Sequence, residues 1–410
     1  MPSEYIPLSI ITFIKVVSLL LIVLKNRYGL PLFFSCLGLS SMNFGYSKLP
    51  GGIGTTDTLE WVAELFFLIV AVLILFYRHK TKIFNVKPNY IFNFFLLIGI
   101  VYVVSIRSFD LYMLSVLLNA LYPVVFYLFI NHFLSENRIS PAELSKYILI
   151  SVGVSLFITL ALFLLGNEIY YFESMDGFAR FRFFGSLGPL TYSYFLLPFA
   201  VYFIVTEKWK LFLLIFLLIL VTGSRLNSMI LFIASSFFFL NRKNLFTKKL
   251  VLIGIIISIP IIVILTVNHF MYFNGGRLEF WNVAIVEAFK SIPTLLFGNG
   301  TGFAKYINYE IFSLHENFPT IHNQFLKISV DVGILLGLFA FFFYPVYAIK
   351  KLSKKNSGRN LFRMYCLISL IVIIVSSTIA DSFNPTLYKS FLLVSFLLQN
   401  EPVKIISSAG

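Results

Sequence analysis

Charged residues are scarce in this chain of 410 residues, and acidic residues are scarcer than basic ones. Only 12% of the residues are charged, whereas 59% are hydrophobic, and the mean hydropathy is +0.89. Soluble domains carry about 25% charged residues, so a chain this apolar has too few polar groups to cover a surface in water. The shortage of charge therefore argues against a water-soluble protein and predicts an integral membrane protein.

Cysteine is nearly absent, which limits the possible disulfide and metal chemistry. Cys36 and Cys366 both lie in apolar runs, so we expect two small core residues and neither a disulfide nor a metal pair. No His/Cys cluster has the spacing of a zinc site, and we expect no metal and no other cofactor. The net charge is +14, but the sequence shows no basic soluble domain that could bind nucleic acid, so we expect no nucleic-acid partner. The N-terminus also lacks the pattern of a removable signal peptide.

Long apolar runs fill most of the chain instead. A membrane-spanning helix needs about 20 mostly apolar residues, and we expect about 12–13 spans. They lie at roughly 5–24, 28–45, 60–77, 89–106, 111–134, 147–165, 184–205, 209–223, 226–240, 250–270, 325–348, 361–380 and 385–399. The expected fold class is all-α: a polytopic transmembrane helix bundle that forms a single domain over residues 1–410.

The loops between these runs predict the orientation. Lys and Arg concentrate in 77–87, 241–249 and 350–363, and cytoplasmic loops are enriched in these residues. Alternation then puts the turns at 25–27 and 135–146 on the same side. The side that the N-terminus faces depends on the span count and stays open.

Two longer loops are expected on the opposite, periplasmic side, at 166–183 and 271–322. In the larger one, the spacing of "RLEFWNVAIVEAF" (277–289) puts Leu278, Trp281, Ile285 and Ala288 on one helical face. This pattern predicts a helix that lies at the membrane interface, with Trp281 at the level of the lipid headgroups.

The basic residues predicted to face outward are mostly arginine, and guanidinium groups bind phosphate in a bidentate way. These arginines are Arg107, Arg180, Arg182, Arg225 and Arg277. Arg225 lies in a very short turn, where a charge near membrane depth is costly unless it has a function. For Arg107 we expect an ion pair with Asp110. Together these arginines indicate a site that binds a lipid-linked phosphate or pyrophosphate.

A polar segment opens the predicted span at 325–348. His322, Asn323 and Gln324 precede it, and a histidine there can serve as a general base or as a residue that only caps the helix. Lys327 and Asp331 have the spacing of a helical ion pair. With Lys15, they are the few charges expected inside the predicted spans. The run "GNGTG" (298–302) lacks the context of a phosphate-binding loop, so we expect a flexible turn there.

These segments resemble the O-antigen polymerase and O-antigen ligase superfamily. "HNQFLKISVDVG" (322–333) fits its His-Asn, nine residues, Gly pattern, and "TGSR" (222–225) resembles its Ser-Arg turn. "GRLEFW" with "FGNGTGF" resembles its periplasmic Arg-x-x-x-Trp helix and Gly-x-Gly turn, and "RFRFFGSLGP" (180–189) resembles its entry to a middle span. The family pattern often has Gly, Thr or Tyr where this chain has Leu336, which argues against the ligase branch.

The resemblance implies a metal-independent glycosyltransferase of the polytopic GT-C type in the bacterial inner membrane, with its site facing the periplasm. The favoured reaction is O-antigen polymerisation, which moves a growing glycan from undecaprenyl pyrophosphate to the non-reducing end of a lipid-linked repeat unit. The matching motifs assign Arg225 and Arg277 to the pyrophosphate and His322 to the acceptor hydroxyl. Arg180, Arg182, Asn323 and Trp281 are expected to bind substrate.

Other functions remain open at this point. Ligation of the glycan to lipid A core and polymerisation of capsule or exopolysaccharide use the same donor chemistry. A flippase for lipid-linked oligosaccharides belongs to a different class, and it needs a charged cavity inside the membrane, whereas the predicted spans contain few charges. The expected partners are the lipid-linked glycans and the bilayer, and whether a chain-length regulator binds is open.

Overall fold

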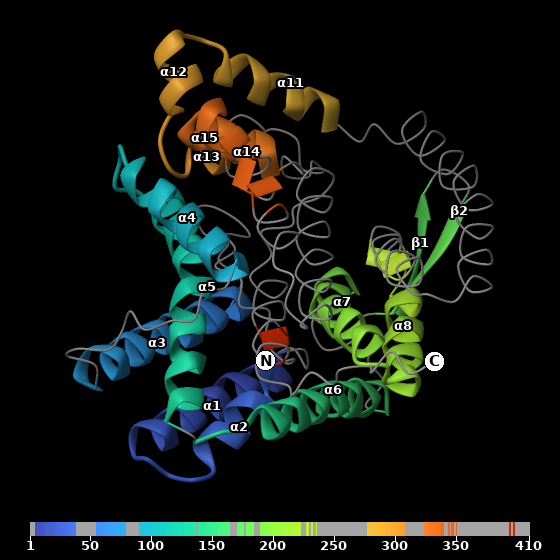
Figure 1. Ribbon diagram of the computed structural model, residues 1–410. Helices are drawn as coiled ribbons and strands as arrows, with labels where there is room; N and C mark the ends of the chain where they lie inside the picture. The colour runs from blue at the N-terminus through green and yellow to red at the C-terminus, as the bar shows by residue number, and fades with distance from the viewer. Residues whose placement is uncertain are drawn as a thin grey trace, which may run out of the picture.

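The structure is a computed structural model in which helices form nearly all of the described elements (Figure 1). It describes residues 5–37, 55–78, 90–136, 138–164, 170–175, 178–183, 189–222, 227–228, 231–232, 235, 277–307, 324–339, 343–344, 346–347, 350, 393–394 and 397. The helices are α1 (Tyr5–Val23), α2 (Gly29–Ser35), α3 (Thr55–Arg78), α4 (Tyr90–Val104), α5 (Leu111–Ser135), α6 (Pro141–Leu164), α7 (Pro189–Val205), α8 (Trp209–Val221), α11 (Arg277–Ala288), α12 (Ile292–Phe297), α13 (Phe303–Tyr306), α14 (Gln324–Val332) and α15 (Ile334–Leu338). The predicted helical class is confirmed at this level.

One β-hairpin interrupts the helical architecture, in the segment that we expected to be a loop. Strands β1 (Tyr170–Met175) and β2 (Phe178–Phe183) pair antiparallel. Asp176-Gly177 separates them, and an Asp-Gly pair is the preferred two-residue connection of a hairpin. The strictly all-α prediction was therefore wrong for this segment, and the Asp-Gly signal could have shown it.

Several helices are apolar enough to lie in a membrane, but their lengths differ. Within the described ranges one segment, Met113–Leu134 of α5, is both long and apolar enough to cross a bilayer, with 22 residues and a mean hydropathy of 2.0. Shorter apolar segments of 10–17 residues lie in α1, α3, α4, α7 and α8. This helix indicates membrane association, and the full set of spans stays a prediction.

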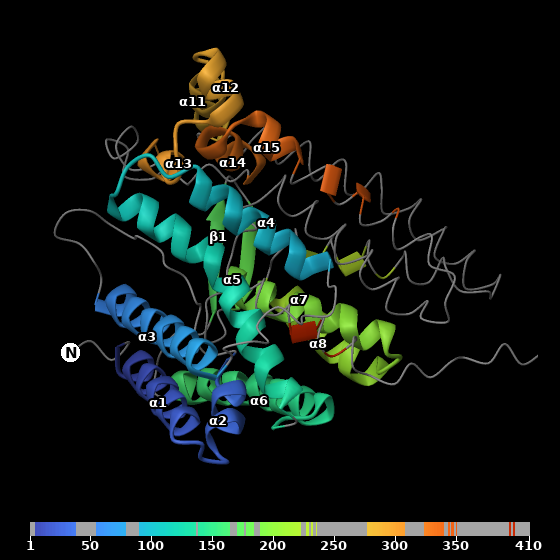
Figure 2. The ribbon, with the colours of Figure 1, turned by 60° about the vertical axis from the view of Figure 1, so that its left-hand side comes forward.

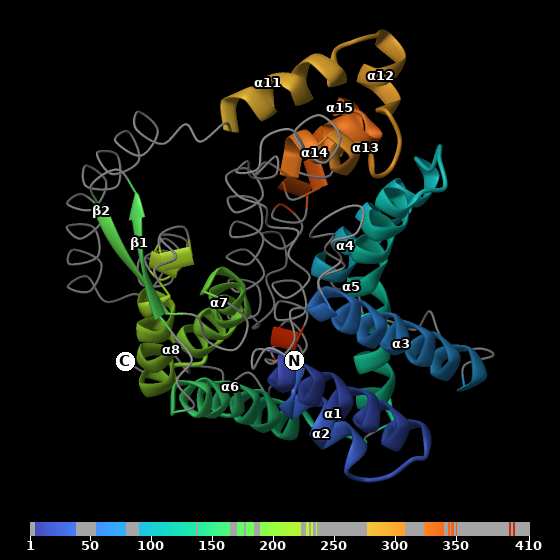
Figure 3. The ribbon, with the colours of Figure 1, turned by 180° about the vertical axis from the view of Figure 1, so that it is seen from behind.

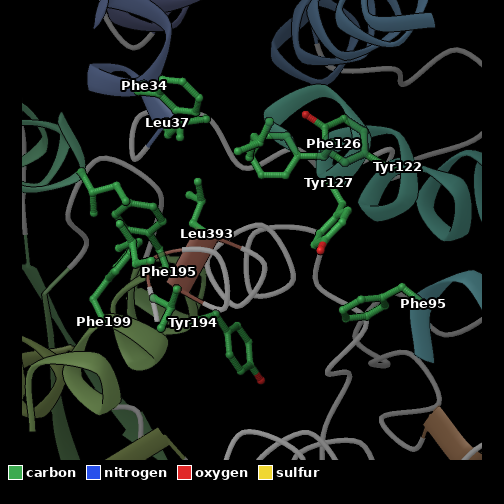
Figure 4. Packing of buried hydrophobic residues seen from close by; sticks show 14 of the residues in the cluster. Phe34, Leu37, Phe95, Tyr122, Phe126, Tyr127, Tyr194, Phe195, Phe199 and Leu393 are labelled. Carbon is green, nitrogen blue, oxygen red and sulfur yellow. The ribbon is translucent and has the colours of Figure 1, made fainter. Parts of the chain in front are cut away.

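The helices pack in sequential pairs around an aromatic core. Contacts join α1 to α2 and α3, α4 to α5, and α7 to α8, and in Figure 2 helices α1, α3, α4 and α5 slant across the view in a similar direction. Phe67 of α3 stacks on Phe33 of α2 at 5.6 Å between ring centroids and meets Phe129 of α5 edge-on at 5.3 Å. Figure 4 shows further members of this core, among them Tyr122, Phe126 and Phe195. Aromatic pairs in these geometries add to the stability that burial provides.

Large apolar side chains also cover the outside of the helices. Phe13 of α1 is 68% exposed and Phe76 of α3 is 73% exposed, and α8 exposes Leu213, Leu214 and Leu217. Soluble monomers rarely expose apolar side chains in such density. These faces fit contact with lipid.

A buried ion pair joins α1 to α3. The ammonium group of Lys15 donates to the carboxylate of Glu64, and both residues are almost fully enclosed. The fully buried Tyr122 of α5 interacts with the same carboxylate. We predicted that Lys15 is a charge inside the spans. Glu64 was not predicted as an interior charge, although it lies in the predicted span 60–77, and its carboxylate neutralises the charge of Lys15.

Candidate functional site

Helices α11 to α15 form a compact unit against the end of α4 and the start of α5 (Figure 1). A small core that contains Ala284, Ala288, Ala304, Ile307 and Val330 holds α11, α13 and α14 together. Alanine at the contact positions of α11 lets the helices approach closely. The unit is built from both sides of the segment 308–323, which lies outside the described residues.

Helices α11 and α14 lie side by side and run in the same general direction (Figures 1 and 3). After α11 ends, α12 contacts α14 and α15, so the C-terminal ends of α11 and α14 are near one another. Both helices therefore begin at the same end of the unit. Arg277 is the first residue of α11, and α14 begins at Gln324, immediately after His322 and Asn323. His322 and Asn323 themselves lie outside the described residues.

Trp281 takes part in this packing. It is half-buried and packs against the small core, together with Leu326 of α14 and Ile334 of α15. Its indole N–H is enclosed and has no hydrogen-bond partner among the described residues. Of the residues expected on one face of α11, Ala288 is buried, whereas Ile285 is 43% exposed and Ala284 is buried instead. The placement of this helix at the membrane interface stays a prediction. The role of Trp281 in binding substrate stays a prediction.

The glycine-rich segment 298–302 is held by hydrogen bonds to two other segments of the chain and is not the flexible turn that we expected. The backbone N–H groups of Asn299 and Gly300 donate to the carbonyl oxygens of Val330 and Asp331, both at 2.8 Å. The N–H group of Thr301 donates to the carbonyl oxygen of Ser105 at 3.0 Å. The segment therefore joins the last turn of α14 to the end of α4.

Close backbone approaches explain two of the glycines. A Cβ atom at Gly298 would lie 2.3 Å from the carbonyl oxygen of Asp331, and one at Gly333 would lie 2.3 Å from the carbonyl oxygen of Leu296. Both residues also have positive φ, 68° and 97°, where glycine is favoured. Gly333 ends α14, so the predicted continuous span 325–348 is broken at this residue.

Asp331 holds the first turn of α13. Its carboxylate accepts a hydrogen bond of 2.7 Å from the backbone N–H group of Ala304, and the residue is only 1% exposed. Lys327 adds an attractive charge from one turn earlier, as the spacing predicted. The pairing is thus only part of the role of Asp331, because its carboxylate also compensates the unpaired N–H groups at a helix start.

Arg107 does not form the expected ion pair with Asp110. The Asp110 carboxylate instead accepts from Ser108 Oγ at 2.8 Å and from the N–H group of Met113 at 2.7 Å, which caps α5. The aliphatic part of the Arg107 side chain lies against Gly300, and the residue is exposed. This arginine therefore borders the α11–α15 unit.

Arg180 and Arg182 occupy alternate positions of β2, so they belong to one face of the hairpin. In the register of the two strands, Arg180 is opposite Glu173 and Arg182 is opposite Tyr171. The strand β2 also contacts α8, whose C-terminus leads into the turn that contains Arg225.

Arg225 lies outside the described residues, but both flanks of its turn are anchored in the core. Thr222 is buried and donates to the carbonyl oxygen of Ile219 at 2.6 Å. Asn227 is fully buried, and its Nδ2 donates to Ser193 Oγ of α7 at 2.6 Å. Asn227 was not among the predicted site residues, although a polar residue two positions after Arg225, at the start of an apolar run, was a usable signal.

The described residues bring together only part of the predicted site. Arg277 and the first residue of α14 share one end of the α11–α14 pair, and His322, Asn323 and Arg225 lie outside the described residues. Among the described residues, no group of three or more His, Cys, Asp or Glu side chains could hold a metal ion. Comparison of the sequence with protein-family models and with curated proteins gives no match, so the family resemblance rests on the motifs.

Proposed function

We propose that this chain is a polytopic glycosyltransferase of the bacterial inner membrane that polymerises O-antigen or a similar surface glycan. The donor is a glycan on undecaprenyl pyrophosphate, and the acceptor is the non-reducing end of a lipid-linked repeat unit. One observation carries the proposal: α11 and α14 begin at the same end of one packed unit. This arrangement puts the start of the Arg277 motif beside the helix that follows the His322 motif.

The membrane part of the proposal is supported by the apolar outer faces of the helices and by the arrangement of two turns. Large side chains such as Phe13 and Phe76 are exposed, which is unfavourable in water and favourable in lipid. The turns around Arg27 and Arg138, both expected to be cytoplasmic, line one common hollow. Two turns on one side of a membrane are expected to meet in this way.

The proposed chemistry follows from the residue types. The acceptor hydroxyl attacks the anomeric carbon of the donor sugar, and the bond from that carbon to the pyrophosphate oxygen breaks. His322 takes the proton of the hydroxyl as a general base. Arg225 and Arg277 stabilise the negative charge that develops on the leaving pyrophosphate, which guanidinium groups do without a metal. Arg180 and Arg182 supply further positive charge for the glycan-lipid.

The glycan of a deletion strain tests the proposal and separates it from its alternatives. Loss of a polymerase leaves the lipid core capped with a single repeat unit, and this is the result we expect. Bare core would identify a ligase. Loss of all surface glycan with trapped lipid-linked units would identify a flippase, and either of these results would overturn the proposal.

A further inference from the structure

A basic hollow lies between the turn that follows α1 and the turn that follows α5. Its volume is about 400 Å³, which lies in the range of small-molecule sites. Its lining includes the cations Lys25, Arg27 and Arg138 and a single acidic residue, Glu143. Apolar side chains such as Leu30 and Ile139 complete the wall. The hollow therefore carries a net positive charge and has apolar side chains in its wall.

The acidic side chains near the hollow are already engaged. Ser140 donates to the Glu143 carboxylate from its backbone N–H group at 2.8 Å and from its hydroxyl at 2.7 Å. These hydrogen bonds cap α6 and hold the pKa of Glu143 below its usual value. Glu136 lies 3.3 Å from Arg138. No carboxylate among the described residues forms an ion pair with Lys25 or Arg27. Arg27 Nη2 donates to the hydroxyl group of Tyr28, which leaves the charge of the guanidinium group unneutralised, so both cations can attract an anionic ligand.

The backbone of Lys25 closes the C-terminal end of α1. Its N–H group donates to the carbonyl oxygen of Ile22 at 3.0 Å, and the N–H group of Asn26 donates to that of Leu21 at 2.8 Å. This pattern ends a helix with a left-handed residue, which is usually glycine, and Lys25 has φ 58°. Lysine is less favourable than glycine in this conformation, so glycine at this position removes the charge without straining the backbone.

The rim of the hollow has the character of a membrane interface. Leu24 is 75% exposed and Tyr28 is 58% exposed, and Arg27 lies over the Tyr28 ring at 4.7 Å. Tyrosine is enriched at the level of lipid headgroups. An exposed leucine beside exposed cations fits a ligand with a charged head and an apolar tail.

We propose that this hollow binds a phosphate group, of the kind that anionic phospholipids present at a membrane surface. Arg27 and Arg138 offer guanidinium donors that match phosphate oxygens, and Lys25 adds a point charge. Basic hollows between helices at the cytoplasmic side of membrane proteins bind anionic headgroups. The site lies apart from the α11–α15 unit, and it does not depend on which reaction that unit catalyses.

Lys25→Gly is a sharp test because glycine removes the charge and also relieves the backbone strain. The full-length protein in neutral detergent is titrated with phosphatidylglycerol, with phosphatidylcholine, and with inorganic phosphate, and its melting temperature is measured. Phosphatidylglycerol should raise the melting temperature of the wild type more than phosphatidylcholine does. In Lys25→Gly, and separately in Arg27→Gln, the apparent affinity should fall about fivefold per removed charge.

Glu207→Gly is the matched control, because Glu207 occupies the equivalent left-handed position after α7, with φ 62°, and no cation is removed. It should keep the full response to phosphatidylglycerol. A response to inorganic phosphate alone that is lost in Lys25→Gly supports the site and identifies a soluble ligand. Equal responses to both lipids together with no response to inorganic phosphate, or unchanged affinity in both Lys25→Gly and Arg27→Gln, would overturn the proposal.

Discussion

The hydroxyl group of Thr301 donates a hydrogen bond of 2.6 Å to the carbonyl oxygen of Tyr102, which lies 199 positions earlier in the chain. This contact attaches the glycine-rich segment 298–302 to α4. The same segment is bound to the end of α14 through the N–H groups of Asn299 and Gly300. This short segment therefore attaches the α11–α15 unit, which begins with Arg277, to the helical core.

Gly298→Ala should disrupt this junction. A Cβ atom would lie 2.3 Å from the carbonyl oxygen of Asp331, and the positive φ alone costs about 1–2 kcal/mol for alanine. We expect a lower melting temperature and less monodisperse protein in size-exclusion chromatography. Gly153→Ala is the matched control, because it lies within α6 and nothing comes within 4 Å of the added atom. Equal stability of the two variants would show that the junction tolerates the change.

The Lys15–Glu64 pair should be sensitive to the loss of one partner and tolerant of the loss of both. Glu64→Gln leaves the Lys15 charge buried without its carboxylate, and breaking a buried pair costs about 3–5 kcal/mol. Replacing both residues, as in Lys15→Met with Glu64→Leu, should recover most of that stability, since apolar residues suit a buried position. Thermal unfolding of the purified variants measures the difference. A double variant as unstable as Glu64→Gln would refute this role of the pair.

The apolar runs predicted many helices to within a few residues because burial and lipid contact both require such runs. The predicted span 111–134 corresponds to α5 (Leu111–Ser135), and the predicted span 89–106 corresponds to α4 (Tyr90–Val104). The break at Gly333 was not predictable from hydropathy, because it depends on the backbone of Leu296 arriving from another segment.

The candidate site was less predictable than the helices. Spacing alone suggested an Arg107–Asp110 pair, but Asp110 caps α5 instead, because an unpaired N–H group at a helix start competes for the same carboxylate. Side-chain partners of this kind depend on local backbone geometry. The predicted roles of Arg225 and His322 stay predictions.

Lysine should replace the site arginines poorly. Arg225→Lys and Arg277→Lys keep the charge but lose the forked donors that match a pyrophosphate, and the loss of one such donor typically costs about 10²–10³-fold in rate. Arg107→Lys is the matched control, because a lysine keeps the aliphatic stem that lies against Gly300. The assay is the length of glycan chains made by each variant at equal abundance. Full chain length in Arg225→Lys and Arg277→Lys would assign both arginines a structural role only.

Cysteine labelling tests the predicted topology. In a protein with Cys36 and Cys366 replaced by serine, an impermeant maleimide added from outside should label Asn282→Cys, since Asn282 is exposed on α11. Asn356→Cys, in the predicted cytoplasmic loop 350–363, should be labelled only after the membrane is opened. The reverse pattern would put the α11–α15 unit on the wrong side for surface glycan synthesis.

The most direct test of the central claim is the activity of His322→Ala. Lys290→Ala is its control, because Lys290 lies in the same predicted outer loop and its one ion pair among the described residues is a surface pair with Glu287 at 3.4 Å. Purified wild type, His322→Ala and Lys290→Ala are each given lipid-linked repeat units, and the glycan chain length is measured. We expect long chains from the wild type and Lys290→Ala, and a loss of about 10²–10⁴-fold in the rate of His322→Ala with unchanged melting temperature. Long chains from His322→Ala at the wild-type rate would show that His322 has no part in the reaction.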